Sequence, residues 1–170
     1  MLAGALAAPL VAPPGTRFHY SNVGYSVSAA IVERVSREPY ERFLARHLFR
    51  PAGMRHTGYV LPRWKRRRVA VEYDRRGRSH GRPFEHPWAP DGPYWNLRGN
   101  GGLLSMARDM ARWHRALEGD RVLGARAKRR LFAPRVPIPV AGYDGFRAAY
   151  GWPWARGSRP TAAATAGVTR

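Results

Sequence analysis

The sequence has no cysteine, so the chain forms no disulfide, carries no thiolate nucleophile and offers no cysteine ligand to a metal ion. It also lacks long hydrophobic runs, and no stretch approaches the ~20 apolar residues that span a bilayer. The apolar start MLAGALAAPLVA has no basic residue before it and is interrupted by Pro9, so it gives no clear signal peptide. These absences leave the cellular compartment open.

Acidic residues are scarce: 11 stand against 30 basic residues, which gives a formal net charge of +19. Only Lys65 and Lys128 are lysines, and the abundant arginine accompanies abundant alanine, glycine and proline, as in proteins from GC-rich genomes. A nucleic-acid-binding protein concentrates its charge on one face. Here only the run from Arg63 to Arg68 is dense, so we expect no specific nucleic-acid partner, and a basic nucleic-acid-binding protein using this run is the alternative.

The length of 170 residues and a hydrophobic fraction of 44% suit one folded domain. We expect this domain to cover residues 1–154. The final stretch 155–170, ARGSRPTAAATAGVTR, has no periodicity and no bulky residue, and this composition predicts a disordered tail.

Helical spacing of apolar residues predicts four helices. The first starts near Tyr25, and its apolar positions are Val27, Ala30, Ile31 and Val35. The second runs from Pro39 to Pro51 with Glu41 outward, and its buried positions are Tyr40, Phe43, Leu44 and Leu48. The third follows a cap at Ser105, and its buried positions are Met106, Met110, Trp113 and Leu117. The fourth is short and lies within residues 121–132.

Other local patterns predict a strand over residues 69–73 and a hairpin turn over residues 74–77. Residues 78–98 are expected to form an irregular loop, and the prolines of residues 134–139 favour an extended segment. Helix and loop should therefore dominate, with few short strands.

Two segments carry the strongest motifs. The first is PPGTRFHYSNVGY, residues 13–25. The first two predicted helices follow it, and the second of them ends in Pro-Ala-Gly-Met, residues 51–54. The second is GNGGLLSMARDMARWHRAL, residues 99–117, and a weaker one is Tyr-Gly-Trp at residues 150–152. Taken alone, the triplet Tyr20-Ser21-Asn22 is only a turn that caps a helix. Taken together and in this order, the segments resemble the serine β-lactamase-related family of class C β-lactamases, DD-carboxypeptidases and esterases.

The resemblance implies an α+β, β-lactamase/transpeptidase-like fold, of which this chain would hold mainly the helical region. It also implies a serine hydrolase that forms an acyl-enzyme from a small amide or ester substrate, such as a β-lactam, a peptidoglycan peptide or an ester. The implied catalytic residues are Tyr20, as a proton shuttle, and Asn22, as a positioning amide. Asn100, Gly101 and Gly102 are candidate substrate-binding residues at the edge of the pocket.

The nucleophile that this chemistry needs is missing. The family places it in a Ser-x-x-Lys motif, and neither lysine of this sequence has a serine three residues before it. Ser105 and Arg108 keep the spacing, but arginine stays protonated and cannot act as a base. His56-Thr57-Gly58 resembles the third family motif, yet its position fits the end of the Pro-Ala-Gly-Met element. We therefore expect a middle fragment that is inactive alone, or a non-functional truncated product.

We expect no cofactor and no metal ion. His80, Glu85 and His86 lack a zinc-binding spacing such as His-Glu-x-x-His. Relatives of this family are commonly exported, but the sequence fixes neither the compartment nor the oligomeric state.

Overall fold

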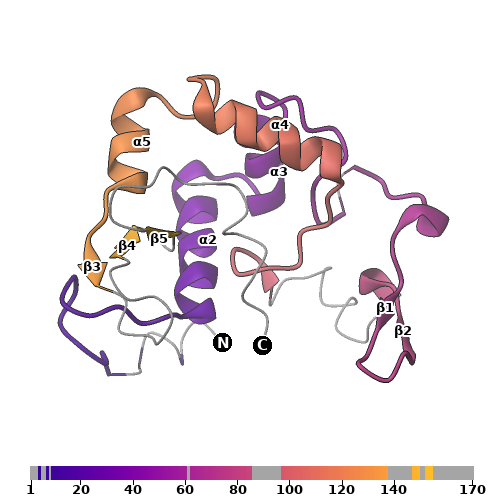
Figure 1. The fold of residues 1–170 in the computed structure, drawn as a ribbon, viewed down its shortest axis with the longest axis horizontal. Helices are drawn as coiled ribbons and strands as arrows, with labels where there is room; N and C mark the ends of the chain where they lie inside the picture. Colours follow the sequence, from indigo (N-terminus) through magenta and orange to yellow (C-terminus); the bar gives the residue numbers. More distant parts are fainter. Residues whose placement is uncertain are drawn as a thin grey trace. The chain divides into compact units, whose positions relative to one another are not determined.

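A computed structural model describes residues 4, 7, 9–60, 62–85, 97–137, 147–149 and 152–154 of the chain (Figure 1). The chain divides into two compact units. One is continuous and contains Asn22–Ala116, while the other combines Met1–Ser21 with Leu117–Arg170. The continuous unit holds most of the motif residues.

Helix α2, Asn22–Ser36, confirms the first predicted helix but buries a different face. Its buried residues are the small Ser26 and Ala29, whereas Ile31 and Val35 are 56% and 78% exposed. The apolar spacing therefore predicts the helix correctly but predicts the wrong buried face. Small side chains are buried because the backbone of another segment, residues 97–102, passes directly against this face.

The second predicted helix is built from two parts. Helix α3, Tyr40–Leu44, continues into a π-helical turn η1, Ala45–Phe49, where the Arg50 N–H donates to the Ala45 carbonyl at 3.0 Å. Inserting a wider turn rotates the later residues, and Phe49 becomes buried together with Leu44.

The end of this helix explains the Pro-Ala-Gly-Met motif. The Met54 N–H donates to the Phe49 carbonyl at 2.8 Å, and the Gly53 N–H donates to the Arg50 carbonyl at 3.0 Å. This pair of bonds is a Schellman motif, whose left-handed position favours glycine. Gly53 occupies it with φ 74°. The motif therefore ends the helix and turns the chain back into the unit.

The prediction that Glu41 faces outward is wrong. Its side chain is buried, and its Oε1 accepts hydrogen bonds from the backbone N–H groups of Tyr59 and Val60 at 2.7 and 2.9 Å. An acidic side chain among other charged residues is expected to be solvated, but here it accepts hydrogen bonds from two backbone N–H groups.

Residues 69–82 form the predicted hairpin, although its strands are shorter than expected. Strand β1, Glu72–Tyr73, pairs antiparallel with β2, Ser79–Gly81, between the short helices η2, Arg66–Arg68, and η3, Pro83–Glu85 (Figure 1). The segment 78–98 is therefore not wholly irregular, because it contains β2 and η3. Its aromatic part, residues 86–96, lies outside the described residues.

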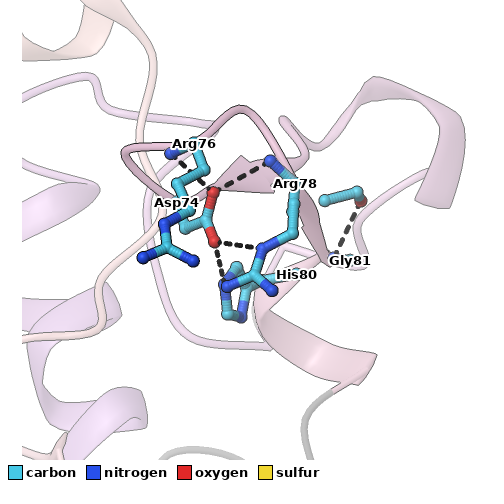
Figure 2. A network of polar contacts seen from close by, with 6 residues as sticks. Asp74, Arg76, Arg78, His80 and Gly81 are labelled. Atoms are coloured by element: carbon cyan, nitrogen blue, oxygen red, sulfur yellow. Dashed lines mark hydrogen bonds and ion pairs between the residues drawn. The ribbon is translucent and has the colours of Figure 1, made fainter.

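Asp74 organises the turn of this hairpin (Figure 2). One carboxylate oxygen accepts the backbone N–H groups of Arg76 and Arg78 at 2.8 and 2.9 Å, and the other accepts the Arg78 Nε–H at 2.7 Å. Hydrogen bonds from the backbone and side chain of Arg78 lower the pKa of Asp74. The carboxylate thus keeps the turn closed in a stretch crowded with positive charge.

Helix α4, Ala107–Glu118, starts where the third helix was expected, but its predicted buried face is wrong. Met106 and Met110 are 40% and 48% exposed, while Asp109 and Ala116 are buried. The helix turns Asp109 inward because its carboxylate accepts hydrogen bonds from the segment 56–57.

The second unit contains helix α5, Ala125–Phe132, within the range predicted for the fourth helix. A three-stranded antiparallel sheet follows, in the order β3-β4-β5, and its strands are β3, Val136–Pro137, β4, Arg147–Ala149, and β5, Trp152–Trp154. The extended segment at residues 134–139 is confirmed in its described part. The expected disordered tail, residues 155–170, lies outside the described residues, so that expectation stays a prediction.

Candidate active site

Tyr20 and Asn22 both have solvent-accessible side chains. Tyr20 is 64% exposed and lies just before helix α2, and Asn22 is the exposed first residue of that helix. A tyrosine kept for packing is usually buried along most of its ring. Exposure of both side chains leaves the phenol and the amide available to a bound molecule.

Asn100 is brought to the same helix. Its Nδ2 donates to Ser26 Oγ at 2.7 Å, and Ser26 stands four residues, one helical turn, after Asn22. Residues 97–102, which we call the glycine loop, form a tight turn in which the Leu97 carbonyl accepts the N–H groups of Asn100 and Gly101 at 3.1 and 2.9 Å. The fold therefore places the glycine loop beside the helix that Asn22 begins.

Gly101 and Gly102 differ in their surroundings. Gly101 is exposed, and a methyl group added there would meet no other atom within 4 Å. Gly102 has φ 74°, and a Cβ on it would lie 3.0 Å from the side chain of Leu97. Of the two, Gly101 has the open space that a substrate-binding backbone needs.

Gly99 explains how the loop approaches helix α2 so closely. With φ 82° it adopts a conformation that favours glycine, and a Cβ there would collide with the Tyr25 carbonyl and the Ala29 side chain. Its N–H donates to the Tyr59 hydroxyl at 3.1 Å. Tyr59 is only 2% exposed, and this burial raises the pKa of its phenol to about 12.

Asp109 is the residue that sequence reasoning missed most clearly. Its side chain is fully buried, and its Oδ2 accepts the His56 N–H at 2.6 Å and the Thr57 hydroxyl at 3.1 Å. Oδ1 accepts the Arg112 Nη1–H at 2.9 Å. Burial alone opposes ionisation, but the bonds from His56, Arg112 and Thr57 outweigh it and lower the pKa of Asp109.

The His56-Thr57-Gly58 segment is joined to the second family segment through this carboxylate. Thr57 Oγ1 is 2.8 Å from Ser105 Oγ, and Gly58 and Leu104 exchange two backbone hydrogen bonds at 3.0 and 2.9 Å. The segment therefore connects the end of the Pro-Ala-Gly-Met element to the residues that follow the glycine loop.

Glu33 fixes the other end of the loop. Its Oε1 accepts the Tyr40 N–H at 2.7 Å and lies 3.3 Å from Arg98 Nη1. Together with Glu41 and Asp109, it links helices α2, α3 and α4 to the loop and to residues 56–60. The signal that could have found these residues is the scarcity of acidic residues in the sequence. Only 11 of 170 residues are Asp or Glu, and three of them stabilise this region.

Among the described residues, no group of three histidine, aspartate or glutamate side chains could hold a metal ion. None of the helices in the described part is long and apolar enough to cross a bilayer.

Comparison with known proteins places the chain in a family. The family model described as Beta-lactamase matches residues 1–169. A Bacillus subtilis protein, PbpX, whose name marks it as a candidate penicillin-binding protein, is 33% identical over 121 residues, or 71% of this chain and 29% of its own length. Penicillin-binding protein 4* of B. subtilis is 28% identical over 153 residues, or 86% of this chain and 33% of its own. The chain thus spans about a third of the length of these relatives.

Solved structures agree with this match. A penicillin-binding protein from Bacillus halodurans is similar with a TM-score of 0.66 and 25% identity, over 89% of this chain and 45% of its own. The octameric penicillin-binding protein homologue from Pyrococcus abyssi gives a TM-score of 0.65 over 84% of this chain and 31% of its own, at 24% identity. The fold is β-lactamase/transpeptidase-like, helix-rich with few short strands, and the chain belongs to the β-lactamase family.

Proposed function

We propose that this chain supplies the Tyr-x-Asn corner of a β-lactamase-related serine hydrolase, with Tyr20 as proton shuttle and Asn22 as positioning amide. The observation that carries the proposal is the exposure of Asn22 at the start of helix α2, with the glycine loop bonded to the same helix one turn further on. Tyr20, two residues earlier in the chain, is exposed as well. Asn100 and Gly101 would then form one edge of the substrate pocket.

The chemistry follows from the residue types. A free tyrosine titrates near pH ~10 and is too weak an acid to serve as a base near neutrality. A neighbouring ammonium group favours the phenolate, so the shuttle needs a lysine beside it. With that lysine and its serine in place, the serine attacks an amide or ester carbonyl and backbone N–H groups stabilise the oxyanion. The C–N or C–O bond then breaks, the protonated amine or alcohol leaves, and water hydrolyses the remaining acyl-serine ester.

Names of similar proteins suggest the substrate class. One structural neighbour is a D-stereospecific amidohydrolase from Streptomyces, and another is a β-lactamase/D-alanine carboxypeptidase from Pseudomonas syringae. We propose an amide of the β-lactam or D-amino-acid type as the substrate of the complete enzyme.

Because this sequence has no Ser-x-x-Lys, we propose that the chain alone does not turn over such substrates. The test is hydrolysis of a chromogenic cephalosporin and of a p-nitrophenyl ester by the purified chain, and we expect rates equal to those of buffer. A measurable rate that is lost in Tyr20→Phe but kept in Tyr73→Phe, another exposed tyrosine, would show that the chain has its own nucleophile and would overturn this part of the proposal.

A further inference from the structure

The continuous unit has a pocket beside the π-helical turn η1. This pocket has a volume of about 510 Å³. Its lining includes none of the candidate active-site residues Asn22, Asn100, Gly101 and Gly102. Ligand pockets typically measure ~300–1,000 Å³, so the pocket is large enough for a small organic molecule.

The local backbone creates this concavity. The wider π-helical turn shifts Ala45 and Phe49 relative to α-helical positions, and the Schellman motif then turns the chain at Gly53. A Cβ at Gly53 would meet only Arg112 Cδ, at 3.9 Å, so the glycine leaves open space where a side chain would stand. Single π-helical turns occur frequently at functional sites.

The lining divides into an apolar floor and a charged rim. Apolar side chains come from Ala45, Phe49, Met54 and Pro62, and the Thr57 hydroxyl is already bonded to Ser105 and Asp109. The rim carries Arg50 and Arg55, and no lining residue is acidic. Within the described part of the chain, neither guanidinium has an ion-pair or hydrogen-bond partner.

We infer that this pocket binds a small amphiphilic anion, whose apolar body lies on Phe49 and Met54 and whose carboxylate, sulfonate or phosphate is held by Arg50 and Arg55. A guanidinium presents a planar fork of donors that matches such oxyanions in a bidentate manner. Because the active-site proposal uses no residue of this pocket, the two proposals stand or fall separately.

The test uses the purified chain and 8-anilinonaphthalene-1-sulfonate, an aromatic body with one sulfonate, followed by fluorescence. We expect saturable binding of one probe per chain, displaced by decanoate but at least about tenfold less well by decanol, which has the same chain length and no charge. The double variant Arg50→Gln/Arg55→Gln should bind at least about tenfold more weakly, since it removes both donors.

The matched control is Arg34→Gln/Arg42→Gln, which removes the same charge from exposed positions outside the pocket and should bind as the wild type does. Ala45→Trp fills the pocket and should abolish binding, with folding checked by circular dichroism. Equal loss in both double variants, non-saturable binding, or unchanged binding in a folded Ala45→Trp would overturn the proposal. If Ala45→Trp does not fold, the comparison of the two arginine double variants decides.

Discussion

At the scale of single residues, Tyr59 connects three segments of the continuous unit. Its backbone N–H donates to Glu41, its carbonyl accepts the Trp64 indole N–H at 3.2 Å, and its hydroxyl accepts the Gly99 N–H. Because the ring is buried, ionising the phenol would place a charge where water cannot solvate it.

This burial predicts a loss of stability at high pH. The folded pKa of Tyr59 is raised to about 12, whereas the unfolded chain titrates near ~10. The stabilisation is complete below pH ~10 and is lost as the pH rises toward 12, because only the unfolded state releases its proton there. We expect the free energy of unfolding in urea to fall by about 2 kcal/mol over this window.

The matched variants for this prediction are Tyr59→Phe and Tyr73→Phe. Tyr59→Phe should remove most of the alkaline loss and cost about 1–2 kcal/mol at neutral pH, because the Gly99 N–H loses its acceptor. Tyr73 is 64% exposed, and its variant should behave as the wild type does. An alkaline loss of the same size in Tyr59→Phe would contradict the assignment.

Asp109 gives the opposite pH dependence. Its pKa is lowered in the folded state, so its contribution is complete above the unfolded value near ~3.9 and is lost as the pH falls through the folded value. Asp109→Asn should lower the free energy of unfolding at pH 7 by about 3 kcal/mol, because it leaves Arg112 and two further donors without the buried carboxylate.

The control for Asp109 is Asp120→Asn, a carboxylate whose side chain is 70% exposed and paired only with Lys128 in the described structure. Exposed pairs contribute about 0–1 kcal/mol, so this variant should change stability little. Urea unfolding curves that coincide for the two variants would show that the buried network around Asp109 is not stabilising.

At the scale of elements, the contact between the glycine loop and helix α2 depends on Gly99. Gly99→Ala must move the loop away from the Tyr25 carbonyl and hold alanine at a positive φ, so we expect a loss of at least about 2 kcal/mol. Gly101→Ala, two residues later, meets no atom and should change stability by less than about 0.5 kcal/mol.

Nuclear magnetic resonance provides the second readout for this pair. The amide signals of Ser26 and Asn100 should shift in Gly99→Ala and stay in place in Gly101→Ala, because only the first substitution separates the two segments. If Gly99→Ala were as stable as the wild type with unshifted signals, the close approach of the loop to helix α2 would be wrong.

The elements also show what the sequence could predict. Helical periodicity located α2, α3, α4 and α5, and turn residues located the β1–β2 hairpin. Periodicity failed on buried faces, because α2 buries Ser26 and Ala29 against a backbone and α4 buries Asp109 against donors. Hydrophobic spacing assumes that apolar side chains pack against apolar side chains, and these faces pack against polar groups of the main chain and of side chains.

Only part of the candidate site could be predicted from the sequence. Tyr20, Asn22 and the Asn100–Gly102 stretch follow from the resemblance of their segments, and not from any pattern in the triplet itself. The acids Glu33, Glu41 and Asp109 were not found, since their partners are backbone N–H groups or residues up to 65 positions away. A single sequence does not indicate which distant donors will meet a carboxylate.

At the scale of the whole molecule, the net charge of +19 does not define the function. The chain matches a β-lactamase family model over residues 1–169, and this finding favours the hydrolase over the nucleic-acid-binding alternative. Its positive charge is also offset locally: Asp74, Glu33 and Asp109 each bind an arginine at a point where two segments or strands meet.

The central claim, that Tyr20 and Asn22 face a catalytic serine, is tested most directly by the rate of penicillin acylation, measured by intact mass spectrometry. The protein to use joins this chain in frame to a Ser-x-x-Lys segment encoded in the DNA before it. We predict one acyl adduct per chain, formed at least about 100-fold more slowly in Tyr20→Phe and at the normal rate in Tyr73→Phe. No Ser-x-x-Lys in the preceding DNA, or equal acylation in Tyr20→Phe and the wild type, would contradict the claim.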